Sequence, residues 1–264
     1  MSVDRVQGSG PREVGAWMAV FPKTLVNTIG GGHLEFQAIN EARALLMKPV
    51  SEKISNSITH NDGALTTRYA LGPALGQCCG GVVHLKFEQI KATDGPMLKQ
   101  RLLAHTQPVA LFGGGHVGHA LVNVISTLPY NVRWIDSRDE IFPSQLPPNV
   151  VCEHSDPVHA AVTDLPSGVA VLIMSFSHAE DLEVVAACLR RQRMHGDLKF
   201  AGLIGSKTKW ATFQHRLASK GFTAEELGFI TCPIGVSGIT GKEPEVIAVS
   251  VAAQLLQLRE PAKS

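Results

Sequence analysis

Two adjacent thiols, Cys78 and Cys79, are the residues of this chain best suited to do chemistry. They lie in the run LGQCCGG at positions 75–81, where glycines on both sides let the backbone turn sharply and let a large ligand approach the main chain. Thiolates are soft donors that suit soft metal ions. The pair, with Gln77 beside it, is therefore a candidate metal and cofactor contact, although free cysteines also occur as buried packing residues.

A second candidate site is the glycine-rich stretch that begins at Gly113. Gly113, Gly115 and Gly118 form a GxGxxG motif between a predicted strand and a predicted helix, and Asp136 ends the next predicted strand. Gly115 and Asp136 are about twenty residues apart, the spacing at which an acidic residue contacts a ribose hydroxyl. Backbone N–H groups at such a helix start bind phosphate, and His116 adds ring nitrogens there. The stretch predicts a phosphate-binding loop, unless its glycines serve only strand–helix packing.

Two further groups are predicted to bind anions. Ser206 and Lys207 follow another predicted strand at the start of a helix, where hydroxyl and ammonium groups can hold an anion. Arg12, in a glycine-rich turn, can donate a planar pair of hydrogen bonds to a phosphate. Each has a plainer alternative, because Lys207 can be a solvated loop charge and Arg12 can pair with a surface carboxylate.

Composition limits the kinds of partner. The chain has 264 residues and a net charge of +1, so no overall field attracts nucleic acid or an anionic membrane. Its five cysteines are irregularly spaced without a CxxC motif, which predicts reduced thiols rather than a disulfide framework or a zinc ribbon. The first five residues, MSVDR, include an acid and form no apolar run, and no segment approaches the ~18 consecutive apolar residues of a membrane span. We therefore expect a cytoplasmic protein with no nucleic acid or membrane partner.

Hydrophobic patterning predicts an α/β protein. Residues 1–95 are predicted to form a small mixed α/β domain, with a helix over 34–48 and a strand over 82–87. Residues 96–107 are predicted to be a linker. Residues 108–264 carry short apolar runs separated by helical segments, which is typical of a Rossmann-like parallel sheet buried on both faces. The expected strands are 109–112, 132–135, 150–152, 169–174 and 200–204, and the last expected element is a buried helix over 244–258.

Taken together, these motifs resemble the XdhC/CoxI family of xanthine dehydrogenase accessory proteins. The order and spacing of the motifs match nearly end to end. The segments that carry the resemblance are GSGPR at 8–12, IGGGHLE at 29–35, GQCCGG at 76–81, GGGHVG at 113–118, LIGSK at 203–207, CPIG at 232–235 and GKEP at 241–244.

The resemblance implies a maturation factor for molybdenum hydroxylases rather than an enzyme with its own turnover, although an intrinsic activity is left open. Such a factor binds the molybdenum cofactor, Mo-molybdopterin, transiently while a cysteine desulfurase supplies sulfur, and it delivers the cofactor to apo xanthine dehydrogenase or a related hydroxylase. The resemblance also implies that Cys78 or Cys79 contacts molybdenum, that the loop from Gly113 to Gly118 holds a pterin or nucleotide phosphate, and that the protein is a homodimer.

Two other functions compete with this interpretation. An NAD(P)-dependent oxidoreductase is favoured by the GxGxxG motif with Asp136 and disfavoured by the lack of a clear proton-relay set. A thiol-exchange protein built on Cys78 and Cys79 is disfavoured because adjacent cysteines form a strained ring and the usual redox spacing is CxxC.

Overall fold

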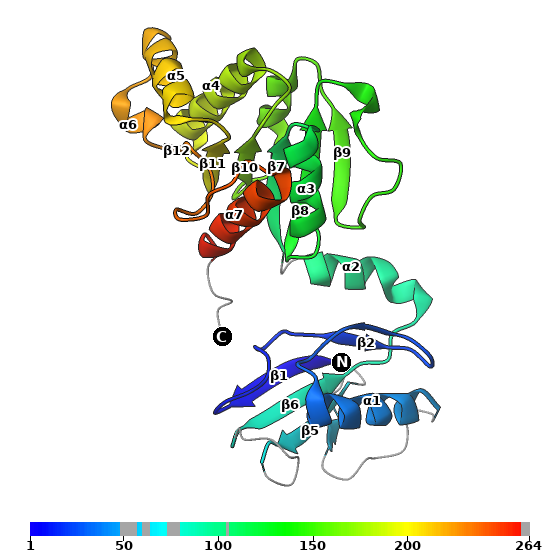
Figure 1. Cartoon of the computed structure of the whole chain (residues 1–264). Coiled ribbons are helices and arrows are strands. Elements are labelled where there is room, and N and C mark those ends of the chain that lie inside the picture. Colours follow the sequence, from blue (N-terminus) through cyan, green and yellow to red (C-terminus); the bar gives the residue numbers. More distant parts are fainter. Residues whose placement is uncertain (48–56, 60–63, 73–79, 104–105, 260–264) are drawn as a thin grey trace. The chain divides into compact units, whose positions relative to one another are not determined.

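The computed structural model of the chain describes residues 1–47, 57–59, 64–72, 80–103 and 106–259. The chain divides into two units between Pro96 and Met97 (Figure 1). Each unit has its own hydrophobic core. Helix α2 (Gly95–Leu103) begins just before this division, so the segment expected to be a linker at 96–107 contains a helix.

The first unit is mixed α/β, as predicted. Its larger sheet has the strand order β1-β6-β5-β4 with every pair antiparallel, and β2 and β3 form a separate hairpin. Helix α1 contributes Leu34 and Ala38 to a core that includes Val83 and Leu85 of β6. The elements are β1 (Ser2–Gln7), β2 (Met18–Val20), β3 (Leu25–Asn27), α1 (Gly32–Met47), β4 (Ser57–Thr59), β5 (Leu65–Ala70), β6 (Val82–Phe87) and the 3₁₀ turn η2 (Ala92–Asp94).

A carboxylate fixes α1 against this sheet. Glu41 accepts hydrogen bonds from Thr67 Oγ1, at 2.8 Å, and from the hydroxyl of Tyr69, both on β5. Burial, and then the carboxylate itself, raise the pKa of Tyr69 far above its ordinary value. The phenol therefore stays protonated and keeps donating to Glu41 across the neutral pH range.

The second unit is built on the predicted parallel sheet. Its six strands have the order β12-β11-β10-β7-β8-β9, and every neighbouring pair is parallel. The elements are β7 (Gln107–Phe112), α3 (His116–Ile125), β8 (Tyr130–Asp136), η3 (Asp139–Ile141), β9 (Val150–His154), η4 (Val158–Asp164), β10 (Ala170–Ile173), α4 (His178–His195), β11 (Phe200–Leu203), α5 (Lys207–Ser219), α6 (Ala224–Leu227), β12 (Ile230–Thr231) and α7 (Pro244–Gln257).

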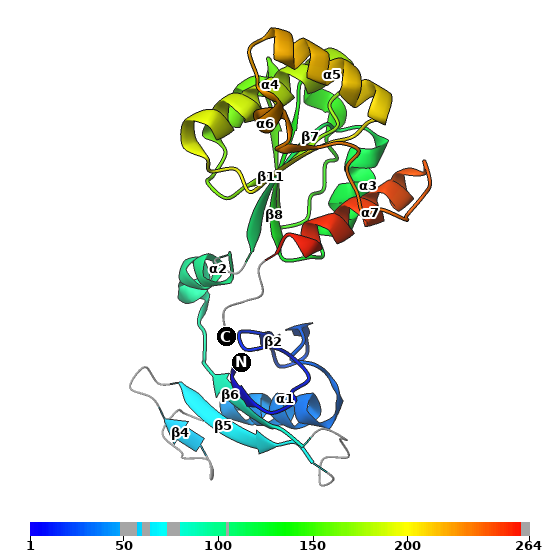
Figure 2. The ribbon, with the colours of Figure 1, turned by 90° about the vertical axis from the view of Figure 1, so that its left-hand side faces the viewer.

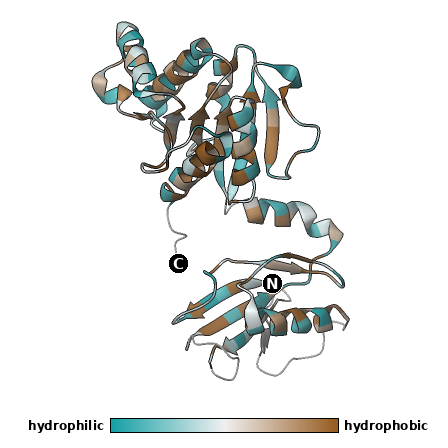
Figure 3. Cartoon of the chain, in the orientation of Figure 1, coloured by the Kyte–Doolittle hydropathy of each residue, from teal (hydrophilic) through white to brown (hydrophobic). Residues whose placement is uncertain are grey.

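Helices cover both faces of this sheet (Figure 2). Helix α4 packs with η4 and α5 on one face, and α3 packs with α7 on the other. The expectation that the helix over 244–258 is buried is only half right for α7. Ala248 and Val251 are buried, but Val249 is 53% exposed and Leu256 is 41% exposed on a helix that is apolar along most of its length (Figure 3). In the described residues, no helix is both long and apolar enough to span a membrane.

The path of the chain reverses beside the central strand β7. From β7 the chain runs outward through β8 to β9, and it then returns to β10 on the other side of β7. Ligands of open parallel sheets bind at the carboxyl ends of the strands beside such a reversal. The loops that follow β7, β8 and β10 are therefore where a ligand site is expected.

One buried arginine holds α4 to the segment around η4. The guanidinium of Arg191 donates to the carbonyls of Val162 and Leu165, both at 2.7 Å, and forms a two-point ion pair with Asp197. Arg191 is only 8% exposed, so these carbonyls have little access to water. Its neighbour Arg190 is exposed on the same helix.

We expect Arg191→Met to lower the free energy of unfolding by about 3 kcal/mol, because it leaves buried carbonyls without donors. Urea unfolding followed by circular dichroism would measure this loss. Arg190→Met is the matched control and should change stability by less than about 0.5 kcal/mol. Equal losses in the two variants would contradict the assigned role of Arg191.

Candidate cofactor-binding site

The glycine loop between β7 and α3 is held tightly against the segment that follows β10. Gly113 has a φ of +123°, and a Cβ atom there would lie 2.0 Å from the carbonyl oxygen of Met174. A Cβ atom on Gly118 would lie 2.2 Å from the carbonyl oxygen of Gly113, which also accepts the indole N–H of Trp134 at 2.9 Å. Gly113 and Gly118 are therefore required by packing, whereas Gly115 meets no described atom within 4 Å and faces open space.

Helix α3 begins without a side-chain cap in the described part of the chain, because its N-cap residue is Gly115. By contrast, Ser177 caps α4 and Ser206 caps α5 through hydroxyl oxygens that accept first-turn N–H groups. The first N–H groups of a helix have no partner within the helix and lie at its positive end. The exposed start of α3 at Gly115 and His116 therefore offers donors to an anion.

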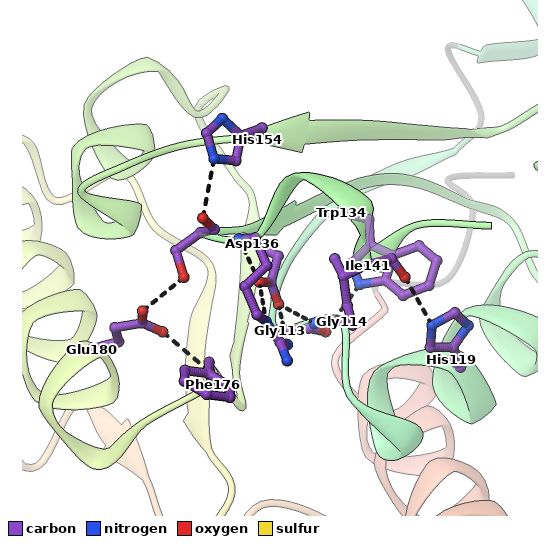
Figure 4. A network of polar contacts seen from close by, with 11 residues as sticks. Gly113, Gly114, His119, Trp134, Asp136, Ile141, His154, Phe176 and Glu180 are labelled. Atoms are coloured by element: carbon purple, nitrogen blue, oxygen red, sulfur yellow. Dashed lines mark hydrogen bonds and ion pairs between the residues drawn. The ribbon is translucent and has the colours of Figure 1, made fainter. Parts of the chain in front are cut away.

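Both carboxylate oxygens of Asp136 already accept hydrogen bonds from groups of the same chain (Figure 4). The carboxylate accepts the Gly114 N–H at 2.6 Å, the Arg138 N–H at 2.9 Å, and Arg138 Nε and Nη2 at 2.8 and 2.9 Å. Burial raises the pKa of Asp136, but these hydrogen bonds outweigh burial and lower it below its ordinary value. Asp136 therefore acts here as a clamp between the glycine loop and the end of β8.

Side chains after β8 also bind the segment after β10 (Figure 4). The Cζ atom of Arg138 lies 4.4 Å from the ring centroid of Phe176. The hydroxyl of Ser137 donates to Glu180 at 2.7 Å, and the other oxygen of Glu180 accepts the Phe176 N–H at 3.1 Å. Since β7 lies between β8 and β10, these contacts flank the glycine loop. Sequence reasoning missed Arg138 and Phe176, because no local motif links them.

The second predicted anion site lies at the start of α5. The Ser206 hydroxyl caps the helix by accepting the Lys209 N–H, and Lys207 is exposed with no hydrogen bond or ion pair to the described residues. Lys209 instead points inward, where its Nζ donates to Asp181 at 2.6 Å and to the Ile204 carbonyl at 2.9 Å. Of the predicted pair Ser206 and Lys207, Lys207 therefore has a charge that is free within the described residues. Lys209, which was not predicted, has a structural role.

A small cavity of about 250 Å³ lies beside this helix start. It is lined by Ile204 and Gly205 after β11, by residues of the segment 233–241, and by Val246, Ile247 and Ser250 of α7. Its walls are mostly apolar, and its volume suits no more than a small ring system.

In the first unit, Glu35 braces the turn that contains the three consecutive glycines. Its carboxylate accepts the N–H groups of Ile29 at 2.9 Å and Gly31 at 3.1 Å, and also the hydroxyl of Thr28. Burial raises the pKa of Glu35, but these hydrogen bonds lower it overall. The Glu35 carboxylate, which belongs to the motif at 29–35, therefore holds the turn of the same motif in place.

The glycine-rich segments of the first unit approach one another closely. A Cβ atom on Gly30 would lie 2.5 Å from Pro11, and a Cβ atom on Gly81 would lie 2.1 Å from the carbonyl oxygen of Ser9. Arg12 lies in the same region, but it pairs with Glu13 at 3.0 Å and donates weakly to a backbone carbonyl. The plainer alternative for Arg12, a surface ion pair, is what the structure shows.

Gln77, Cys78 and Cys79 lie outside the described residues. Within the described ranges, no group of three or more histidine, cysteine, aspartate or glutamate side chains is arranged to hold a metal ion. The three cysteines that the structure describes are free, and burial raises the pKa of each, that of Cys188 to about 12. Cys152, Cys188 and Cys232 are therefore protonated at neutral pH and are poor metal ligands.

We expect Asp136→Asn to lower the free energy of unfolding by about 3 kcal/mol at pH 7, because a buried, multiply bonded carboxylate is lost. The folded-state pKa of Asp136 lies below its unfolded value, so its contribution is present above about pH 4 and is lost as the pH falls through the folded pKa. The difference between wild type and variant should therefore shrink below pH 4. Urea unfolding at several pH values would test this, with the exposed Asp139→Asn as control; a constant difference would contradict it.

Known proteins similar to this chain agree with the motif-based resemblance. Residues 109–255 match the XdhC Rossmann domain, and residues 1–53 match the XdhC and CoxI family. The uncharacterized protein YqeB of Escherichia coli K12 is 25% identical over 257 residues, which are 97% of this chain and 42% of YqeB. The chain thus spans less than half the length of this relative.

A solved structure has the same fold. The crystal structure of a Bacillus halodurans protein described as a xanthine dehydrogenase aligns with a TM-score of 0.71 and 20% identity. The alignment covers 100% of this chain and 92% of that one, so the likeness in fold extends over both units. With the Rossmann-domain match covering more than half of its residues, the chain belongs to the XdhC and CoxI family.

Proposed function

We propose that this protein is a maturation factor for molybdenum hydroxylases that binds the molybdenum cofactor transiently and passes it to an apo-enzyme. The observation that best supports this proposal is the uncapped start of α3 at Gly115, in a chain of the XdhC and CoxI family. Helix N–H groups and the helix dipole favour a phosphate group. We assign the phosphate of the cofactor's pterin to Gly115 and His116, in the loop that Gly113 and Gly118 shape.

We assign the molybdenum contact to Cys78 or Cys79, with Gln77 as a neighbouring polar group. The other three thiols of the chain have raised pKa values, which makes them poor ligands. A single thiolate contact can be exchanged, whereas a multidentate cage would trap the metal. Such a contact suits a protein that must give its cargo away.

The partners that we propose follow from this role. They are a cysteine desulfurase, which supplies the sulfur, and the large subunit of a xanthine dehydrogenase or related hydroxylase, which receives the cofactor in the cytoplasm. We propose that the protein works as a homodimer. We assign secondary anion contacts to Lys207, whose charge is free in the described residues, and to Ser206 and Arg12, whose hydrogen bonds would have to be shared with the ligand.

An NAD(P)-dependent oxidoreductase remains the second candidate, since the strand order and the GxGxxG loop are those of a dinucleotide-binding fold. One observation weighs against it. A ribose hydroxyl needs a free carboxylate oxygen, and both oxygens of Asp136 are filled by Gly114 and Arg138. Unless Arg138 moves away, Asp136 cannot bind the ribose of NAD.

Cofactor retention tests the main proposal. We expect the purified protein, incubated without oxygen with released molybdenum cofactor, to keep about one molybdenum per chain after gel filtration. Cys78→Ala or Cys79→Ala should lower retained molybdenum at least about tenfold, and the control Cys152→Ala should not. Metal analysis and pterin fluorescence are the readouts. Full retention in a variant that lacks both cysteines would refute the thiol contact, and selective retention of NAD(H) would favour the oxidoreductase.

A substitution at Gly115 tests the phosphate site separately. Its backbone is extended and its surroundings are open, so an aspartate fits there and caps α3. We expect Gly115→Asp to keep or slightly raise the melting temperature while it lowers pterin retention at least about tenfold, because a carboxylate then occupies the anion site. The uncharged control Gly115→Ala should retain the cofactor. Equal retention in the aspartate and alanine variants would rule out phosphate at this helix.

A further inference from the structure

We propose that Arg138 and Phe176 form a platform on which the planar ring system of the ligand, a pterin or a purine, stacks. This inference rests on the proposed function, because it takes the start of α3 as the place where the ligand's phosphate binds. It adds a second contact, of different chemistry, on the same carboxyl edge of the sheet.

The guanidinium plane of Arg138 is fixed before any ligand arrives. Asp136 holds it at two points, through Nε and Nη2, and Asp136 is itself only 1% exposed and bonded to Gly114. One side of the guanidinium rests on the ring of Phe176. The Arg138 side chain nevertheless remains 35% exposed, and Phe176 remains 66% exposed. A flat, rigid surface is therefore open to solvent next to the glycine loop.

The local charge favours a neutral ring over a second phosphate. Arg138 is neutralised by Asp136, and Glu180 adds a further negative charge that acts on the same guanidinium. Two carboxylates against one cation disfavour another anion. A planar heterocycle needs only the face of the guanidinium, because guanidinium groups stack on aromatic rings without giving up their ion pairs.

A similar group elsewhere in the unit shows what a purely structural arrangement looks like. Arg193 makes a two-point ion pair with Glu226 and lies 4.9 Å from the ring centroid of Phe222. There the ring is only 6% exposed, so it is already covered by the fold. The ring of Phe176 is left uncovered, at the chain reversal where ligands bind.

The Asp136 clamp also determines how a ligand is recognised. Because Asp136 accepts four hydrogen bonds from the chain, it has no role in reading a ribose diol. The ring is then held by stacking and the phosphate by the helix, whereas the sugar or side-chain hydroxyls between them contribute little. Affinity should accordingly depend on the ring and the phosphate.

Calorimetry with four probes tests this inference on the full chain: AMP, 2′-deoxyAMP, neopterin monophosphate and ribose 5-phosphate. We expect at least one ring-bearing probe to bind about tenfold more tightly than ribose 5-phosphate, and AMP and 2′-deoxyAMP to bind equally. The tighter of AMP and neopterin monophosphate identifies the ring as purine or pterin.

Variants assign the effect to the platform. Arg138→Lys, which keeps the charge but loses the plane, and Phe176→Leu, which changes an exposed side chain, should each weaken the ring-bearing probes about tenfold. Both should leave ribose 5-phosphate unchanged. Arg193→Lys is the matched control and should change nothing. Melting temperatures check that the variants fold.

The results that would refute the platform differ from those that would refute the phosphate site. If ribose 5-phosphate binds as tightly as every ring-bearing probe, or if Arg138→Lys weakens all probes equally, the platform is refuted while the phosphate site stands. If AMP depends on its 2′-hydroxyl, Asp136 reads the sugar and the platform is again refuted. If no probe binds, or if Gly115→Asp leaves binding unchanged, the phosphate site fails and the platform fails with it.

Discussion

The buried carboxylate of Asp136 is the interaction on which the carboxyl edge of the parallel sheet depends. It fixes the turn at Gly114 and the plane of Arg138 at once, and Arg138 in turn contacts Phe176 across the position of β7. A carboxylate that is 1% exposed must be well paired, and its four hydrogen bonds provide this. The geometry of three separate loops thereby follows from one charged group.

Carboxylates that accept hydrogen bonds from their own chain also position segments elsewhere in both units. Glu35 organises the triple-glycine turn, Glu41 holds α1 on its sheet, and Asp181 accepts both Ser175 N–H and Lys209 Nζ. Glu35 and Asp181 accept hydrogen bonds from N–H groups where the chain turns, whereas Glu41 accepts hydroxyl groups of strand β5. The protein thus uses internal acids to shape loops and to hold α1, and the exposed start of α3 at Gly115 differs because no side chain of the described residues caps it.

Much of the second unit could be predicted from sequence, because strands buried on both faces read as continuous apolar runs such as 109–112 and 200–204. The two-residue strand β12 is too short to give such a signal. The exposure of Val249 depends on which side of α7 packs against α3, which apolar content does not reveal. The spacing from Gly115 predicted Asp136 as a site residue. The contact between its partner Arg138 and the ring of Phe176 could not be predicted, because it exists only in the folded structure.

The tight contacts of Gly113 and Gly118 have a further consequence for access to the glycine loop. Backbone approaches that leave no room even for a methyl group lock the glycine loop after β7 both to the segment after β10 and to α3. Helices shield both flat sides of the sheet. Within the described residues of the second unit, the rim where the strands terminate is therefore the route by which a ligand can reach the glycine loop. For the proposed maturation factor, this means that a recipient protein would have to dock at that rim to take over the cofactor.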